Sequence, residues 1–253
     1  MNPSILITAY KHPELVESNI KRIRETYNLL NNAPIVVVTT SEEDVGYYNM
    51  TKKYNNVYLI EFKDAPPYEP VWYGTSDQEP GWNYGISLSK RIFLSMEKGL
   101  DLISQLNSDV CLHLHSDSYW DSNKEKTLYD LMKEVHDKEL LFSGDLCVDD
   151  LTSSVTKNTL FQPEGLIINI NIAKTYMFNK LSRIWDGDFN SNNWGSIEML
   201  IGQFAEFCLS GILICNKNTE HSELYKEKIK IRLVRNYHGN FENGLVNMKI
   251  KQR

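Results

Sequence analysis

The chain of 253 residues is 42% hydrophobic, which is enough to bury one sizeable core, and we expect a single domain over residues 1–253. Its 27 basic and 33 acidic residues give a net charge of −6 without long blocks of one sign, which argues against nucleic-acid binding. No apolar run approaches the roughly 18 residues that cross a bilayer, and no signal peptide precedes the first strand-like segment, so we expect a soluble, cytoplasmic protein.

Strand-like and helix-like segments alternate along the first part of the chain. Residues 34–40 form a β-branched run that is too continuous for a half-exposed strand, so they suit a central parallel strand covered on both faces. This alternation is typical of a Rossmann-like α/β sheet, which binds ligands beyond the carboxyl ends of its strands. We therefore expect a nucleotide at that edge. The predicted strands are 4–9, 34–40 and 57–62, and the predicted helices are 12–30 and 42–54.

The rest of the chain is less regular. Residues 63–85 are rich in turn formers and aromatic rings, which predicts a packed loop, and residues 185–194 are rich in Asp, Asn and Gly, which predicts a second loop. No internal repeat and no linker divides the chain into two domains. Further helices are predicted at 86–104, 126–136 and 197–208, and further strands at 110–114, 140–142, 166–170, 212–215 and 229–234.

The most informative segment follows the predicted strand 110–114, where Asp117 lies in a turn two residues after His115. Carboxylate oxygen is a preferred ligand of Mg²⁺ and Mn²⁺, and such a cation can bridge the phosphates of a nucleotide sugar, so we predict Asp117 as a direct ligand. The alternative is a surface turn in which Asp117 and Ser118 only cap the next element. His113 lies on the same face of the strand as His115 and is interpreted as a core histidine.

At this point the chain resembles the GT-A glycosyltransferases, in particular the inverting, family-2-like enzymes with an Asp-x-Asp turn after their fourth strand. Ser4–Tyr10, followed by Lys11-His12-Pro13-Glu14-Leu15, is similar to the first strand and helix of that family. Residues 82–99 resemble the helix before the metal turn, and His115-Ser116-Asp117 occupies the Asp-x-Asp position. The resemblance implies a GT-A fold, that is, a Rossmann-like, mixed but mainly parallel sheet flanked by helices.

The resemblance also implies an activity. A GT-A enzyme moves a sugar from a UDP- or GDP-sugar donor to a hydroxyl of a glycan or other acceptor, assisted by Mn²⁺ or Mg²⁺. Residues 1–120 would form the nucleotide-binding half and residues 121–253 the acceptor-binding half. His115 replaces the first acid of the family pair, although imidazole can still bind Mn²⁺ or a ribose hydroxyl. The late His238 would complete the metal shell, with a surface loop histidine as the alternative.

This departure at His115 keeps a second hypothesis open, a catalytically degenerate GT-A-like protein that binds nucleotide or glycan without turnover. A nucleotidyltransferase that makes the activated sugar is a third and more distant hypothesis. The sequence contains no Gly-rich phosphate loop that would support it.

The family binds the base and ribose at the ends of the first two strands, where an apolar or aromatic wall and polar groups are needed. Lys90 and Arg91 match a basic position of the third helix that faces the diphosphate, and a solvated helix face is the alternative. His115 and Ser116 border the same place. The nucleotide-binding residues implied by the resemblance are Thr8, Ala9, Tyr10, Thr40, Ser41, Glu42, Lys90, Arg91, His115 and Ser116.

An inverting transfer needs a general base that removes the proton of the acceptor hydroxyl. In the family this carboxylate lies near the start of a helix in the second half, and Glu198 matches that place. Asp186 and Asp188, on the preceding loop, are competing bases, and an ordinary capping or surface role is a third interpretation. Trp194 is placed to stack on a sugar, and Trp120 is the second predicted acceptor-binding residue.

Overall fold

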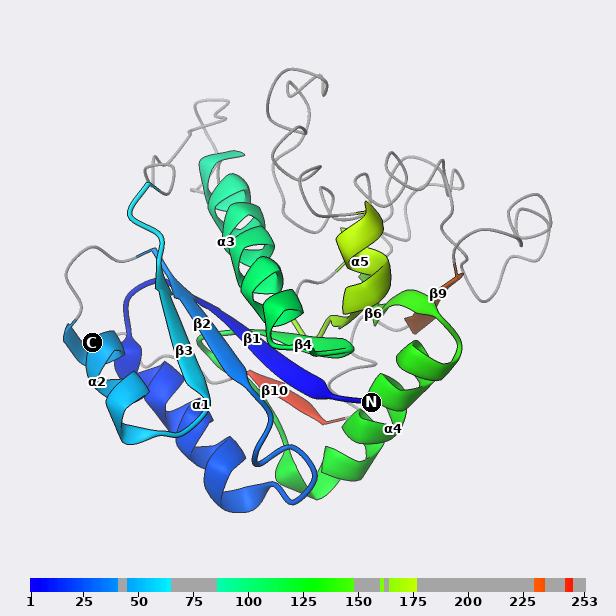
Figure 1. Cartoon of the computed structure of the whole chain (residues 1–253), viewed down its shortest axis with the longest axis horizontal. Coiled ribbons are helices and arrows are strands. Elements are labelled where there is room, and N and C mark those ends of the chain that lie inside the picture. Colours follow the sequence, from blue (N-terminus) through cyan, green and yellow to red (C-terminus); the bar gives the residue numbers. More distant parts are fainter. Residues whose placement is uncertain are drawn as a thin grey trace, which may run out of the picture.

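The computed structural model of the chain has a central β-sheet with helices on both faces (Figure 1). The structure describes residues 1–40, 45–64, 86–147, 160–161, 164–176, 230–234 and 244–247. One side of the sheet consists of four parallel strands in the order β3-β2-β1-β4. Their bounds are β1 Pro3–Ala9, β2 Ile35–Thr39, β3 Val57–Glu61 and β4 Val110–His115. Because these strands are parallel neighbours, their carboxyl ends meet at one edge of the sheet.

The apolar composition of the central strands follows from their burial on both faces. All of β2 is buried, and only the first residue of β1 and the last residue of β4 are partly exposed. Side chains alternate between the faces, so Ile5 and Ile7 join a core cluster with α1 (Pro13–Thr26) and α4 (Glu125–Asp137). This arrangement explains why the strands read as continuous apolar runs.

The other side of the sheet is mainly antiparallel. Strand β8 pairs with β4, and β6 pairs with β8, both in antiparallel fashion. Strand β7 adds antiparallel to β6, whereas β9 runs parallel to β6. The sheet is therefore mixed, with parallel pairing on its β3-β2-β1-β4 side and mainly antiparallel pairing beyond β4. The bounds are β6 Leu140–Cys147, β7 Leu160–Phe161, β8 Ile167–Asn169 and β9 Lys230–Val234.

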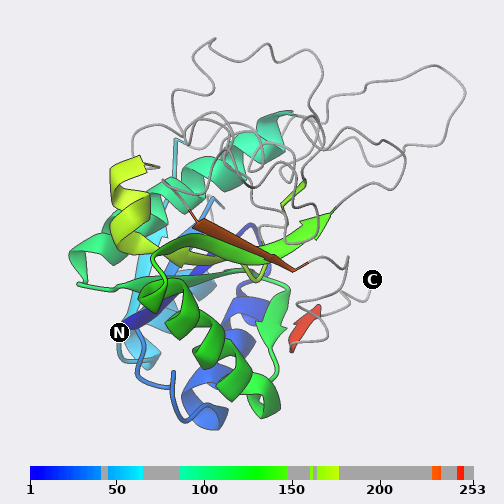
Figure 2. The same ribbon diagram turned by 90° about the vertical axis from the view of Figure 1, so that its right-hand side faces the viewer.

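Helices cover the two faces of the sheet. α1 and α4 lie on one face, and α3 (Ile86–Gln105) and α5 (Ile170–Tyr176) lie on the other (Figures 1 and 2). α2 (Val45–Lys53) packs beside α1 and β3. Gly99 allows α3 to approach β1 closely, because a Cβ atom there would lie 2.2 Å from Cδ1 of Leu6.

A second, two-stranded sheet lies on the side of the main sheet that α1 and α4 cover. β5 (Ser118–Trp120) pairs antiparallel with β10 (Leu245–Asn247), and a short 3₁₀ helix, Ser122–Lys124, leads from β5 into α4. Trp120 and Leu245 are both buried in the core that α1 and α4 cover. This small sheet therefore closes the core directly behind the turn that joins β4 to β5.

The helices and strands predicted for the first part of the chain are confirmed as β1–β4 and α1–α4, with ends that differ by up to four residues. The strand predicted at 140–142 is longer and reaches Cys147. The strand predicted at 166–170 ends at Asn169, because Oδ1 of Asn169 accepts a hydrogen bond from the Ile172 backbone N–H at 3.2 Å and caps α5. The elements predicted at 185–194, 197–208 and 212–215 lie outside the described residues.

The described helices include none that is both long and apolar enough to cross a membrane.

Candidate functional site

A pocket of about 170 Å³ opens at the carboxyl ends of β1, β2 and β4, on the face that α3 covers. Its place agrees with the edge at which a Rossmann-like sheet binds ligands. Most of the residues predicted to bind nucleotide or metal that the structure describes lie around it. The lining residues are Thr8, Ala9, Tyr10, His12, Thr40, Arg91, Ile92, Ser95, His115, Ser116 and Asp117.

The chain turns sharply where β1 meets the pocket. Lys11 and His12 both have left-handed backbone angles, with φ values of 58° and 55°, before Pro13 starts α1. The Tyr47 hydroxyl donates a hydrogen bond to the Lys11 carbonyl at 2.5 Å and holds this turn. The reversal directs Tyr10 and His12 into the pocket lining.

Arg91 is the buried cation of the pocket. Its residue is only 8% exposed, and its Nη2 donates a hydrogen bond to the Thr40 carbonyl at 3.0 Å. The guanidinium carbon also lies 4.7 Å from the centre of the Tyr10 ring, a cation–π contact. Among the described residues no carboxylate forms an ion pair with Arg91. A guanidinium placed in the lining of a pocket is a suitable group for an anionic ligand.

The turn between β4 and β5 carries His115, Ser116 and Asp117. Ser118 closes this turn, since its Oγ accepts from the His115 N–H at 3.0 Å and donates to the His115 carbonyl at 3.3 Å. Asn19 of α1 fixes the turn from below, because its Nδ2 donates to the carbonyls of Ser116 at 3.2 Å and Ser118 at 2.7 Å. Asn19 is fully buried, so the turn is anchored to the core.

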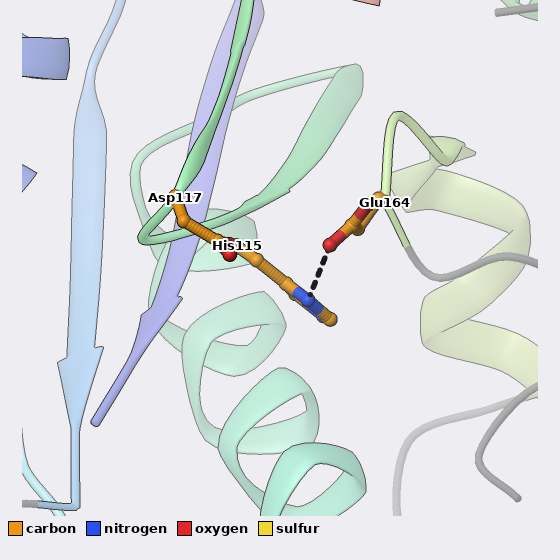
Figure 3. Close-up of side chains that lie close together, drawn as sticks. All are labelled: His115, Asp117 and Glu164. Atoms are coloured by element: carbon orange, nitrogen blue, oxygen red, sulfur yellow. Dashed lines mark ion pairs between the residues drawn. The ribbon is translucent and has the colours of Figure 1, made fainter. Parts of the chain in front are cut away.

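Glu164 approaches this turn from the segment before β8 (Figure 3). Its Oε1 lies 3.0 Å from Nδ1 of His115, and both side chains are about one-fifth exposed. One ligand atom each of His115, Asp117 and Glu164 lies within 4.8 Å of the others. An imidazole nitrogen and two carboxylate oxygens at this spacing are a donor set that a divalent cation accepts.

The local charge favours a cation at this place. Partial burial raises the pKa of Asp117 above its usual value, and the negative charge of Glu164 raises it further, whereas His115 acts in the opposite direction. Two carboxylates in a partly buried site repel one another unless a positive charge lies between them. A bound divalent cation would provide that charge.

His113 is a core residue, as the sequence predicted. It is fully buried, and its Nε2 is hydrogen-bonded to Oγ1 of Thr8 at 2.9 Å. The His113 and His115 rings meet edge to face, with centroids 5.3 Å apart, which confirms that they share one face of β4. His113 thus links the pocket wall to the turn that carries His115.

Trp120 does not line the pocket. It has no exposed surface and belongs to the core cluster, and the Tyr27 hydroxyl donates a hydrogen bond to its carbonyl oxygen. A fully buried ring offers no face to an acceptor sugar, so the predicted acceptor-binding role of Trp120 is not supported. Trp120 ends β5, which pairs with β10, and its partner in that pair, Leu245, is also buried in the core.

Several predicted residues are not placed by the structure. Lys90 is part of the backbone of α3, and the position of its side chain is outside what the structure describes. Outside the described residues are Ser41, Glu42, Asp186, Asp188, Trp194, Glu198 and His238.

Two residues at the site escaped the sequence prediction. Glu164 precedes Gly165 and a predicted strand, and an acid beside a glycine before a strand is a common loop pattern that carries no motif. His12 was assigned only to the start of a helix, although its left-handed backbone turns it toward the pocket.

No protein-family model matches the sequence, and neither does any curated protein sequence. Among solved structures, an active-site mutant of LgtC matches with a TM-score of 0.55 and 12% identity, over 97% of this chain and 86% of that chain. Core-mannan synthase A from Aspergillus fumigatus, in its Mn/GDP form, matches with a TM-score of 0.54 and 12% identity, over 81% and 69% of the two chains. A cytidylyltransferase from Leptospira borgpetersenii matches with a TM-score of 0.44 and 15% identity, over 94% and 77%.

The sheet order, the flanking helices and the first two of these likenesses define the class of fold. The chain has a GT-A fold, with a Rossmann-like, mixed and mainly parallel sheet between two layers of helices. At 12% identity the likeness establishes the fold, and the activity has to be argued from the site.

Proposed function

We propose that the chain is a glycosyltransferase that moves a sugar from a UDP- or GDP-sugar to a hydroxyl of a glycan or other acceptor. One observation carries the proposal. The pocket at the strand ends joins a buried, positively charged Arg91 to a turn with an imidazole and a carboxylate, His115 and Asp117. A cationic group and a turn that can hold a metal ion, at the edge of an α/β sheet where ligands bind, suit the charge of a nucleoside diphosphate.

The nucleotide lies along the ends of β1 and β2 in this proposal. Thr8, Ala9 and Tyr10 border the pocket on one side and Thr40 on the other, which supports a place for the base and ribose. Ser41 and Glu42 follow Thr40 in the sequence and are assigned to the nucleotide from the sequence alone. The guanidinium of Arg91 faces the diphosphate, with Lys90 beside it in sequence.

His115 and Asp117 hold Mn²⁺ or Mg²⁺ in this proposal, with His238 as a further ligand assigned from the sequence. The nitrogen and carboxylate donors fit either cation, with imidazole favouring Mn²⁺. When bound there, such a cation would supply positive charge beside the diphosphate leaving group. Asn19 and Ser118 keep the turn in shape, so the ligand atoms are positioned before the cation binds.

The acceptor binds to the half formed by residues 121–253, and the donor to the half formed by residues 1–120. Glu198 removes the proton of the attacking hydroxyl, with Asp186 or Asp188 as the competing base. Trp194 stacks on the sugar. These assignments rest on the sequence resemblance.

A second function is a GT-A-like protein that binds a nucleotide or glycan without turnover. The observation that favours it is the 3.0 Å contact of Glu164 Oε1 with Nδ1 of His115, which stands at the sequence position where the family has its first acid. Donor binding without sugar transfer would be the outcome for such a protein.

Thermal unfolding with UDP, GDP and their common sugars, each with and without Mn²⁺, tests the donor site. The form of core-mannan synthase A that contains Mn and GDP supports including that pair. A ligand at about 100 times its dissociation constant stabilises the folded protein by about 2.7 kcal/mol, which is a measurable rise in Tm. We expect stabilisation by one nucleotide and Mn²⁺ together, and its loss in Asp117→Ala. Asp130→Ala, on the exposed surface of α4, is the control.

Turnover is tested by the release of UDP or GDP from the stabilising donor in the presence of glycan acceptors. Release by the wild type that Asp117→Ala and Glu198→Gln abolish supports transfer. Nucleotide binding without release over a broad acceptor panel favours the binding protein. If no nucleotide raises the Tm under any condition, the glycosyltransferase proposal fails.

A further inference from the structure

Position 115 holds an imidazole, yet a second carboxylate lies at the same place in space. Glu164 comes from a different part of the chain, and its Oε1 is 3.0 Å from Nδ1 of His115 (Figure 3). The Asp117 carboxylate belongs to the same group of ligand atoms. The turn therefore has two acids and one imidazole around one point, although its own sequence contributes a single acid.

The turn that carries Glu164 is fastened to β4. The Gly165 N–H donates to the His113 carbonyl at 2.9 Å, and the His113 N–H donates to the Leu166 carbonyl at 2.8 Å. Gly165 has a φ of 71°, a left-handed angle that favours glycine and sets the direction in which Glu164 leaves the chain. The carboxylate is thus held beside the end of β4 by backbone hydrogen bonds that do not involve its own side chain.

The spacing of the donors suits a shared cation. Two atoms bound at about 2.1 Å and at right angles to one cation lie about 3.0 Å apart, which equals the separation of Glu164 Oε1 and His115 Nδ1. Both side chains are about one-fifth exposed and therefore poorly solvated, and His115 also lines the pocket.

We propose that Glu164 is a direct ligand of the divalent cation and supplies the carboxylate that position 115 lacks. The cation site then consists of His115, Asp117 and Glu164, with one nitrogen and two oxygen donors from two distant segments. This inference deepens the proposed function and rests on it, because the cation serves the nucleotide donor. An imidazole in the donor set favours Mn²⁺ over Mg²⁺.

The competing role for Glu164 is to orient His115 by accepting a hydrogen bond from its ring. The two roles differ in one respect. A ligand contributes to metal binding whether or not His115 is present, whereas an orienting residue has nothing to orient once the imidazole is removed. A comparison of Glu164 variants in two backgrounds therefore separates the roles.

The experiment measures Mn²⁺ binding to the protein alone, from the loss of the electron paramagnetic resonance signal of free Mn²⁺. The proteins are the wild type, Glu164→Gln, His115→Ala and the His115→Ala/Glu164→Gln double variant. Gln keeps the size of Glu and a hydrogen-bond acceptor but removes the charge. Asp130→Asn on α4 removes a charge far from the turn and is the matched control. Thermal unfolding without metal establishes that each variant is folded.

We expect Glu164→Gln to weaken Mn²⁺ binding by about tenfold or more in both backgrounds, and Asp130→Asn to leave it unchanged. An equal Mn²⁺ affinity of Glu164→Gln and the wild type would overturn the inference. A loss that occurs only when His115 is present would overturn it too, because Glu164 would then act through the imidazole. In either case the donor site can still be tested by Asp117→Ala and nucleotide, so failure here is distinct from failure of the proposed function.

Discussion

Arg91 shows how a single residue can define the ligand class of the pocket. Arg91 is only 8% exposed as a residue, so its guanidinium loses hydration on folding, and it contacts the Thr40 carbonyl and the face of the Tyr10 ring. These contacts fix its orientation, and among the described residues no carboxylate forms an ion pair with it. Such a group is oriented in advance toward phosphate oxygens, which accept charge-assisted hydrogen bonds from the guanidinium fork.

Replacement of Arg91 by Met should therefore discriminate between ligands with and without phosphates. A hydrogen bond to a charged group contributes about 1.5–3 kcal/mol, so we expect Arg91→Met to raise the Kd of UDP or GDP by about 10- to 100-fold. The Kd of the matching nucleoside should change by no more than about twofold, because the base and ribose contacts remain. Isothermal titration calorimetry with the nucleotide and the nucleoside measures both.

Lys98→Met is the control for this substitution, since Lys98 is an exposed residue of the same helix whose ammonium lies over the Phe62 ring. Equal losses of nucleoside and nucleotide affinity in Arg91→Met would mean that Arg91 only shapes the pocket wall through Tyr10.

At the scale of elements, the turn that carries His115 and Asp117 depends on a contact between α1 and the β4–β5 connection. Asn19 is buried in α1 and spans the gap to two carbonyls of the turn, Ser116 and Ser118. Without Asn19 both carbonyls would lose the hydrogen bond that its side chain donates. The helix therefore acts as a scaffold for ligand geometry as well as a cover for the sheet.

Asn19→Leu keeps the size of the side chain and removes both donors. We expect it to lower the free energy of unfolding by about 1–3 kcal/mol, the cost of unsatisfied buried carbonyls, and to weaken Mn²⁺ binding by about tenfold because Asp117 is less well positioned. Urea unfolding and Mn²⁺ titration measure the two effects.

Ser4→Ala is a useful comparison for Asn19→Leu. Ser4 is fully buried, and its Oγ donates to the Val110 carbonyl at 3.3 Å, at the opposite end of β4 from the turn. The Ser4→Ala variant should be less stable than the wild type but should bind Mn²⁺ with the same affinity. An unchanged metal affinity in Asn19→Leu, despite a loss of stability, would limit Asn19 to a structural role.

The sequence predicts elements well where burial imposes a continuous or periodic apolar pattern. β1, β2 and β4 are apolar runs because both faces are covered, and α1, α3 and α4 each have a clear apolar stripe. The three-residue strands β5 and β10 have too few residues for a period to emerge, and their pairing joins segments about 125 residues apart. That pairing also explains the burial of Trp120, which local sequence does not indicate.

The candidate site follows the same rule. Thr8, Thr40 and Asp117 were predictable because the carboxyl ends of parallel strands converge at one edge. Glu164 was not, because it reaches the site through the antiparallel pairing of β8 with β4. The pairing of β8 with β4 leaves no pattern in the sequence around Glu164, whose neighbours are typical of an ordinary turn.

At the scale of the whole molecule, the site joins the two parts of the chain. The pocket and the metal turn come from residues 8–117, whereas Glu164 comes from the segment before β8. If one cation binds both, its binding free energy also holds the 164–166 turn against β4. Local opening of that turn should then become rarer when metal is bound, since a ligand that prefers the closed form shifts the population toward it.

Hydrogen exchange tests this coupling. We expect Mn²⁺ to slow amide exchange in a peptide covering residues 164–170, where the Gly165 N–H donates a hydrogen bond to the His113 carbonyl. The exchange should be about tenfold slower when the Mn²⁺ concentration is about ten times its Kd. The Glu164→Gln variant should show no such slowing. Peptides from β2 and β3, which contribute no ligand to the cation, are the internal reference because a merely global stabilisation would slow their exchange as well. Equal slowing in all peptides, or slowing that persists in Glu164→Gln, would mean that the cation is bound by the β4–β5 turn without the second part of the chain.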